Sequence, residues 1–280
     1  MQCLRRHLIR FLAATAVLAS VSALGQSEEV PFITSPDSVT LEMLRIANVG
    51  PGDHVVDLGS GDGRIVILAA KRFGATGLGV EIVPELVGQS IRSAREAGVA
   101  ERVTFRQQDL FQTDFSAASV ITMYLLPQVN LQLRPALLAL KPGTRVVSHD
   151  WDMGDWQPDR TTVVPVPDKQ VGVEKSSKVH LWVVPARMDG LWCGTAALRE
   201  FRLRLSQRYQ EVQGSLARRD RVRVIEGRID GSMLRTQATR VGSLVLTMAG
   251  DELAVTSGEG ALALARGATF RRAAGATCDG

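Results

Sequence analysis

Apolar and polar positions follow two different rhythms along this chain. With helical spacing, apolar side chains recur over residues 37–47, 65–71, 84–97 and 130–140. Short β-branched runs lie between and after these segments, at residues 55–58, 77–81, 103–105, 119–124, 145–148, 161–166 and 178–184. Alternating helices and strands of this kind predict an α/β fold with a doubly wound, mostly parallel, Rossmann-like sheet.

The rhythm changes after about residue 186. Short alternating runs separated by glycine turns recur at residues 200–212, 222–229, 233–239, 243–248, 252–256 and 261–265. Such spacing predicts a small antiparallel β barrel or sandwich over residues 187–272, followed by a disordered tail at 273–280. This small all-β domain is either a docking module for a partner or substrate, or an appendage that stabilises the domain at 26–186.

Residues 1–25 have the pattern of a signal peptide. Arg5, Arg6 and Arg10 precede an apolar run over residues 11–24 that is too short for a confident membrane span. A twin-arginine signal and an organelle transit peptide remain alternatives. We therefore expect an exported protein, periplasmic or membrane-associated, with a cytoplasmic-facing location as the alternative.

Charge and cysteine content restrict the function only slightly. Residues 1–25, the expected leader, carry three of the 33 basic residues and none of the 29 acidic ones. The rest of the chain therefore has nearly equal numbers of basic and acidic residues. Nucleic-acid binding therefore loses its support from composition, and no nucleic acid is expected as a partner. Outside the leader, Cys193 and Cys278 could form a disulfide in an exported protein or remain free thiols.

A glycine-rich loop follows the first expected strand. Asp57 precedes Gly59, Gly61 and Gly63, with Ser60 between the first two glycines. This spacing is neither the dinucleotide fingerprint nor a phosphate loop, which would need a lysine. An acid at the mouth of the loop repels phosphate but suits a ligand carrying an ammonium and a sulfonium. The pattern therefore predicts an S-adenosyl-L-methionine (SAM) site.

Two further acids end the next two strands. Glu81 lies about 20 residues beyond the glycines, an interval at which a carboxylate can bind ribose hydroxyls. Asp109 could accept a hydrogen bond from the adenine amine, with Leu110 or Phe111 against the ring. The alternative for either acid is a helix cap or a solvated loop position.

Residues 31–184 resemble a class I SAM-dependent methyltransferase, because the glycine loop, Glu81 and Asp109 match its cofactor motifs. More narrowly, residues 31–36 and 57–66 resemble a membrane-associated branch that includes the mitochondrial lysine methyltransferases of the adenine nucleotide translocase and the ATP synthase c-subunit. This resemblance implies protein lysine as the acceptor. It also implies that Thr34 or Ser35 contacts the methionine end of SAM, although a helix cap at Ser35 or Asp37 is equally consistent with the sequence.

Candidate catalytic residues follow the fourth and fifth strands. Tyr124 either borders the methyl group or is simply the aromatic residue at a buried strand end. The Asp/Asn-Pro-Pro-aromatic motif of adenine and glutamine methyltransferases is not present there. His149 is a candidate general base. Asp150 and Asp152 could attract a lysine ammonium or accept its proton, beside two tryptophans at 151 and 156. Alternatively, the tryptophans are packing residues and the acids are solvated.

The favoured function is a SAM-dependent methyltransferase acting on an amine, with a membrane-associated partner as one option. Two rivals remain. One is a small-molecule O- or N-methyltransferase, in which His149 would matter more than the acids. The other is a non-catalytic exported binding protein that retains the fold. The four histidines and three cysteines show no ligand spacing, so no metal site is expected.

Overall fold

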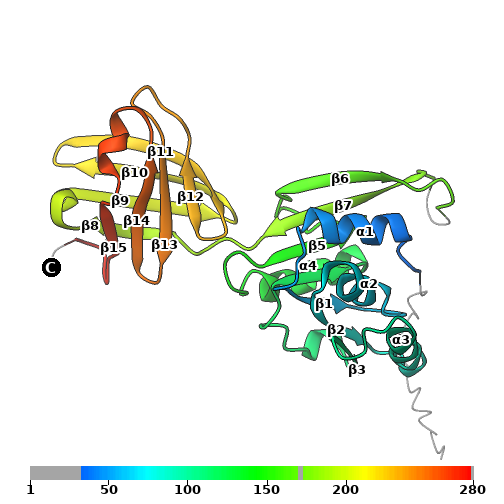
Figure 1. The fold of residues 1–280 in the computed structure, drawn as a ribbon. Coiled ribbons are helices and arrows are strands. Elements are labelled where there is room, and N and C mark those ends of the chain that lie inside the picture. Colours follow the sequence, from blue (N-terminus) through cyan, green and yellow to red (C-terminus); the bar gives the residue numbers. More distant parts are fainter. Residues whose placement is uncertain (1–32, 170–172, 279–280) are drawn as a thin grey trace, which may run out of the picture. The chain divides into compact units, whose positions relative to one another are not determined.

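The computed structural model describes residues 33–169 and 173–278 (Figure 1). The expected signal peptide at residues 1–25 lies outside the described residues. Two structured regions follow one another along the chain: an open sheet with helices, and a closed β barrel. Among the described residues, no helix is long and apolar enough to cross a membrane.

Seven strands form the open sheet. They are β1 (His54–Leu58), β2 (Thr76–Glu81), β3 (Val103–Gln107), β4 (Val120–Met123), β5 (Arg145–His149), β6 (Arg160–Pro165) and β7 (Ser176–Val183). Their order across the sheet is β3-β2-β1-β4-β5-β7-β6, and the first five pair in parallel. Strand β7 runs antiparallel to both β5 and β6, so β6 runs in the same direction as β5. The carboxyl ends of β1 to β6 therefore meet at one edge, where ligands bind in sheets of this kind.

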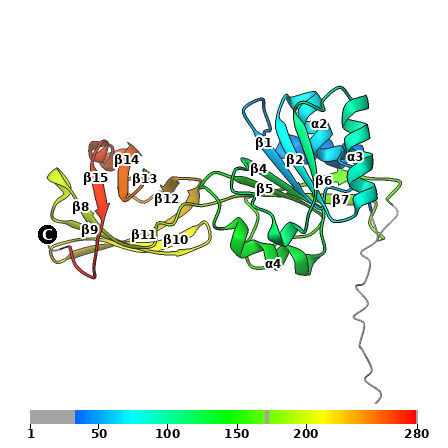
Figure 2. The same ribbon diagram turned by 90° about the horizontal axis from the view of Figure 1, so that it is seen from below.

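Helices cover both faces of this sheet (Figure 2). They are α1 (Asp37–Ile46), α2 (Arg64–Phe73), α3 (Pro84–Glu96) and α4 (Pro127–Leu137). Because strand side chains alternate between faces, Val55 packs in the cluster that includes α1 and α2, whereas Val56 and Leu58 pack in the cluster that includes α4. The predicted doubly wound α/β fold is confirmed.

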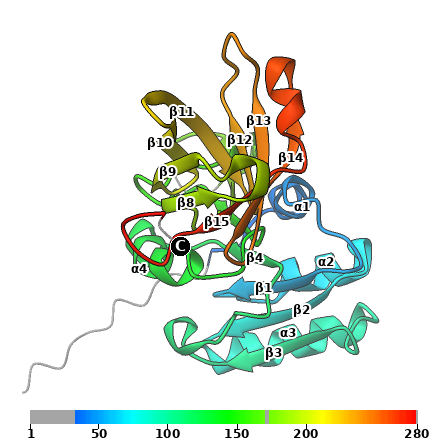
Figure 3. The same ribbon diagram turned by 90° about the vertical axis from the view of Figure 1, so that its left-hand side faces the viewer.

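The C-terminal region is a closed eight-stranded barrel (Figure 3). Its strands are β8 (Gly190–Gly194), β9 (Phe201–Arg208), β10 (Glu211–Arg218), β11 (Arg221–Asp230), β12 (Met233–Thr236), β13 (Leu244–Ala249), β14 (Glu252–Gly258) and β15 (Thr269–Arg272). Closure follows from the pairing of β15 with β8. On β9, Leu203 and Leu205 are buried in the barrel core while Arg202 and Arg204 are exposed, as the alternation predicted. The structure therefore selects the barrel over the sandwich.

Two expected strands differ from the structure. The alternating run at 200–212 is two strands, because Tyr209 adopts a positive φ of 54° in the turn between β9 and β10. Residues 261–265 were expected to be a strand, but they lie in the 3-10 helix η3 (Gly260–Ala265). The run there contains only alanine and leucine, which lack the β-branching that favours a strand.

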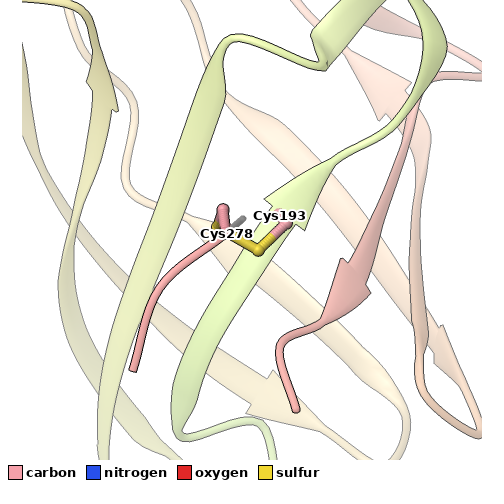
Figure 4. The surroundings of a disulfide bond; sticks show 2 residues. All are labelled: Cys193 and Cys278. Atoms are coloured by element: carbon pink, nitrogen blue, oxygen red, sulfur yellow. A yellow bond between two sulfur atoms is a disulfide. The ribbon is translucent and has the colours of Figure 1, made fainter. Parts of the chain in front are cut away.

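The end of the chain is joined covalently to the barrel. Cys193 on β8 and Cys278 form a disulfide (Figure 4). The bond resolves the alternatives left open for these cysteines in favour of pairing. It also ties residues 273–278, where a disordered tail was expected, to the first strand of the barrel.

Candidate functional site

The loop between β1 and α2 brings the backbone close to its surroundings. Gly59, Gly61 and Gly63 all have positive φ, between 53° and 78°. A Cβ on Gly63 would lie 2.6 Å from the Phe105 ring, and one on Gly59 would lie 2.9 Å from Leu125 Cδ2. Glycine is therefore required at these positions by conformation and by space. The three glycines leave the backbone of the loop accessible to a ligand in front of the α2 N-terminus, a feature that we call the glycine cradle.

Glu81 fastens this loop to the end of β2. Its Oε2 accepts a hydrogen bond from the Gly61 N–H at 2.9 Å, and its Oε1 accepts from the N–H groups of Ile82 and Val83 at 2.8 and 3.0 Å. Each carboxylate oxygen has lone pairs beyond these contacts. The predicted role in binding ribose hydroxyls is therefore compatible with the geometry.

Asp57 is a buried carboxyl group at the carboxyl end of β1. Only 2% of the residue is exposed, and Thr122 Oγ1 on β4 donates to its Oδ1 at 2.7 Å. Burial raises the pKa of Asp57 to about 7, with smaller contributions from the negative charges of Asp62 and Glu81, whereas the bond from Thr122 opposes the rise. A carboxyl group held in this way is stabilised in its charged form by a nearby cation.

Ser60 completes the cradle. The residue is 6% exposed, and its hydroxyl has no hydrogen-bond partner within the described residues. The site therefore offers an unpaired hydroxyl on Ser60, an accessible glycine backbone and the buried carboxyl group of Asp57, which a cation would stabilise. These features fit a ligand with the polar groups and positive charge of SAM.

Asp109 caps its own loop. It precedes the 3-10 helix η1 (Leu110–Gln112) and accepts a hydrogen bond from the Phe111 N–H at 2.9 Å. The capping alternative is thus realised, and the contact with adenine stays a prediction. Leu110 packs against the core, whereas Phe111 is 44% exposed.

The segment before α1 reaches across to the end of β5. Ser35 Oγ lies 2.8 Å from His149 Nδ1, and the Arg64 guanidinium donates to the Ser35 carbonyl at 2.9 Å. The residue preceding α1 is Pro36, and neither Ser35 nor Asp37 caps the helix with its side chain. The capping alternative is wrong here. Thr34 is half-buried in the same segment, and its contact with SAM stays a prediction.

His149 is buried beneath Tyr124. The two rings stack with their centroids 3.9 Å apart, and His149 is 2% exposed. Its Nε2 lies 3.5 Å from Asp150 Oδ2, too far for a hydrogen bond but close enough for the carboxylate to favour a proton on Nε2. Nδ1 then accepts from the Ser35 hydroxyl. In this tautomer the imidazole has no lone pair left to serve as a general base.

Burial also keeps the His149 ring neutral. It lowers the pKa of His149 to about 4, and the charge of Lys169 adds to the effect although Asp150 opposes it. Tyr124 is half-buried, and burial and the charge of Asp150 raise the pKa of its phenol. Both rings are therefore uncharged near neutral pH.

Asp150 is occupied by a lysine that the sequence analysis missed. Lys169 donates to Asp150 Oδ2 at 2.8 Å, and the Lys178 N–H donates to Oδ1 at 2.8 Å. Burial of the carboxyl group disfavours its charge, but these bonds and the positive charge of Lys169 lower the pKa of Asp150 overall. No sequence signal links Asp150 to a residue in the loop that follows β6.

The remaining acids and aromatic residues of this loop differ in accessibility. Asp152 is exposed and accepts from the Gly154 N–H at 3.0 Å. Trp151 is 43% exposed, whereas Trp156 is fully buried and packs near Trp182. The packing alternative therefore holds for Trp156, and Trp151 and Asp152 remain available to an acceptor.

Comparisons with known proteins agree with this geometry. A model of the "ANTKMT methyltransferase domain" matches residues 57–160. A protein-lysine N-methyltransferase of Saccharolobus islandicus is 41% identical over 157 residues, covering 55% of this chain and 94% of its own. The lysine N-methyltransferase of the mouse ATP synthase c-subunit is 37% identical over 134 residues, covering 48% of this chain and 53% of its own. This chain thus spans about half the length of the mouse protein.

A solved structure is also similar. The crystal structure of an RNA methyltransferase from Salinibacter ruber, in complex with S-adenosyl-L-homocysteine, shares 50% sequence identity and has a TM-score of 0.50. The match covers 56% of this chain and 96% of that one. The chain therefore belongs to the class I SAM-dependent methyltransferases, in the family that includes the lysine methyltransferases of the ATP synthase c-subunit and the adenine nucleotide translocase. The predicted class of enzyme and its cofactor are confirmed.

Proposed function

We propose that this methyltransferase transfers the methyl group of SAM to the ε-amino group of a protein lysine. The observation that carries the proposal is the edge of the sheet where β4 and β5 end. There, Tyr124 is supported from below by His149, and the exposed Trp151 and Asp152 lie nearby in sequence. The names of the archaeal and mouse relatives support the same acceptor.

Each residue has a separate part in this proposal. When bound, SAM supplies an electrophilic methyl carbon on a sulfonium. Asp57 neutralises positive charge on the cofactor, and Glu81 holds its ribose. Since Lys169 already neutralises Asp150, Asp152 is the carboxylate that attracts the incoming ammonium. Trp151 contacts the methylene stem of the acceptor lysine.

His149 positions Tyr124 in this account. The Ser35 hydroxyl holds the imidazole by a hydrogen bond at Nδ1, and the Asp150 carboxylate lies 3.5 Å from Nε2. The imidazole in turn supports the plane of the phenol. The acceptor amine must lose a proton before it attacks, and the proton passes to Asp152 or to solvent. Alignment of the amine with the methyl group is then the main contribution of the protein.

An acceptor assay tests the proposal. The full-length chain is incubated with methyl-labelled SAM and with membrane proteins, soluble proteins, RNA and small molecules from the source cells, each fraction separately. We expect label in protein that acid hydrolysis releases as methyl-lysine, and a loss of label with Glu81→Ala. Label confined to small molecules, or none in any fraction, would contradict the proposal.

RNA is the second candidate acceptor, because the Salinibacter ruber structure is titled an RNA methyltransferase and shares 50% identity. The same assay separates the two, since label in RNA resists protease and is released by nuclease. Recovery of label only in RNA would replace lysine with a nucleotide as the acceptor.

We also propose that the protein works in an oxidising compartment. The Cys193–Cys278 disulfide supports this location, because such bonds persist in exported proteins and are rare in reducing cytosol. Fractionation of source cells with alkylation of free thiols before lysis tests the location. Recovery of the protein in the cytoplasm with both thiols alkylated would contradict it.

A further inference from the structure

The barrel has an excess of positive charge, although acidic and basic residues are nearly equal in number over the chain beyond residue 25. Residues 187–272 contain fifteen arginines and no lysine, against nine carboxylates. The described part of the methyltransferase region has the opposite balance, with more acidic than basic residues. Among the described residues, the net positive charge therefore resides in the barrel.

Strand pairing shows that much of this charge gathers at one end of the barrel. Arg218 pairs with both Phe201 and Arg221, so the start of β9 and the β10–β11 turn lie together. Gly194 pairs with Phe270, Leu244 with Gly258, and β14 with β15, which brings the β8–β9, β12–β13 and β14–β15 connections to that same end. Figure 3 shows the β10–β11 turn, the β12–β13 connection and η3 at the top of the barrel.

We call this region the basic end and define it as residues 195–200, 218–224, 237–243 and 259–268. It holds seven arginines and three carboxylates. Glu200 pairs with Arg218 and Arg219 at 3.0 and 2.9 Å. Five arginines have no ion-pair partner within the described residues: Arg199, Arg221, Arg223, Arg240 and Arg266.

Exposed aliphatic side chains lie at the same end. Val222, Val224 and Leu264 are 65%, 74% and 95% exposed, and within residues 190–278 they are the large apolar side chains that solvent reaches most. The valines belong to a part of β11 that pairs only with β10, because β12 begins its pairing at Gly227. Val222 and Val224 therefore project from the free edge of the β9–β10–β11 segment, next to Arg221 and Arg223 along the strand. Leu264 projects from η3, next to Arg266 in sequence.

We propose that the basic end docks on an anionic lipid bilayer. The unpaired arginines would contact lipid phosphates, and Val222, Val224 and Leu264 would enter the interfacial layer, where burial of apolar surface adds to the electrostatic attraction. A protein that binds at the membrane surface without spanning the bilayer needs both the electrostatic attraction and the buried apolar groups for stable attachment.

The same residues fit a nucleic acid less well. Proteins that bind single strands stack bases on exposed aromatic rings. The basic end, as defined, contains no aromatic residue. Phe201, which follows it on β9, is half-buried, and the Arg218 guanidinium covers it at 5.2 Å from the ring centroid. Aliphatic rather than aromatic exposure favours the bilayer as the occupant.

Hydroxyl-radical footprinting of the full-length chain tests the proposal residue by residue. The probe is a vesicle of phosphatidylcholine with phosphatidylglycerol, compared with phosphatidylcholine alone. We expect oxidation of Val222, Val224 and Leu264 to fall with the anionic vesicle, while Val163, a 58% exposed valine on β6, stays unchanged. Because each residue reports separately, any binding by the leader does not imitate this result.

Charge variants provide the second measurement. Arg221→Gln with Arg223→Gln removes two charges at the basic end, and Arg187→Gln with Arg235→Gln removes two elsewhere on the barrel. At about 1 kcal/mol for each arginine near an anionic surface, the first pair should weaken partitioning by up to about 30-fold, and the second pair should leave it nearly unchanged.

Three results would overturn the proposal. They are absence of protection at all three aliphatic residues, equal protection of Val163, and protection by single-stranded polyuridylate but not by vesicles. The last result would assign the surface to nucleic acid. None of these outcomes depends on methyl transfer, so the test is independent of the proposed acceptor.

Discussion

Replacing Asp57 with asparagine should stabilise the unliganded protein while impairing its cofactor site. The carboxyl group is buried, and its pKa of about 7 is far above the ordinary value of 3.8. This difference corresponds to about 4 kcal/mol of destabilisation when the folded protein must carry the charge. Asparagine keeps the acceptor oxygen for Thr122 without the charge, and the effect of the Thr122 bond on the charged form is already contained in the pKa of about 7. Asp57→Asn should therefore raise the free energy of unfolding by about 4 kcal/mol at pH 8.

The dependence on pH distinguishes this effect from ordinary repacking. An acid whose pKa is raised by folding destabilises the protein at high pH, and the destabilisation disappears as the pH falls through the folded pKa toward the unfolded one. For Asp57, linkage gives a cost of about 4 kcal/mol at pH 8 and about 2 kcal/mol at pH 5. The advantage of Asp57→Asn should therefore shrink by about 2 kcal/mol between these two values.

Urea denaturation of both proteins at pH 8 and pH 5 measures this difference. The reasoning would be refuted if Asp57→Asn were less stable at pH 8, or if the difference between the proteins were the same at both pH values. The same carboxyl should release a proton when SAM binds near pH 7, because the cation lowers its pKa. Calorimetry in buffers of different ionisation enthalpy detects that proton, and Asp57→Asn should not release it.

Three further predictions concern other parts of the structure. Gly63→Ala should lower the free energy of unfolding by about 2–4 kcal/mol in chemical denaturation, because its Cβ would lie 2.6 Å from the Phe105 ring. Gly98→Ala is the control, since Gly98 has a similar φ but open space around it, and it should lower the free energy of unfolding by only about 1 kcal/mol. Equal losses in the two variants would contradict the packing argument. Replacing Cys193 and Cys278 together with serine should cost about 4–5 kcal/mol, because the disulfide closes a loop spanning 85 positions; an unchanged midpoint in guanidinium would contradict this. Asp152→Asn should lower turnover at subsaturating acceptor without changing SAM affinity in calorimetry, and unaltered turnover would remove Asp152 from the acceptor site.

Local patterns in the sequence predicted the sheet well. The glycine loop, the acid at 81 and the period of each helix are local features, so their positions follow from residues within a few places of each other. The positions at which the barrel strands end were harder to predict. The turn at Tyr209 interrupts an alternating run without a glycine or proline. Residues 261–265 are all apolar, so no polar alternation distinguishes a strand from a helix there.

Contacts between distant segments were not predictable from the pattern. Ser35 and His149 are 114 positions apart, and their hydrogen bond changes the interpretation of His149 from a candidate base to a support for Tyr124. Similarly, the ion pair between Lys169 and Asp150 turns an expected acceptor-binding acid into a neutralised one. Such roles depend on which loops the sheet order brings to the same edge.

Calorimetric titration of the full-length chain with SAM and with S-adenosyl-L-homocysteine tests the central claim most directly. We expect both to bind, and Glu81→Ala to weaken binding by about tenfold or more through the loss of hydrogen bonds to a charged group. Glu85→Ala, at an exposed position in the first turn of α3, is the matched control and should bind as the original chain does. Absence of binding by the folded protein, or equal affinities of the Glu81 and Glu85 variants, would contradict a cofactor site built on the glycine loop and Glu81.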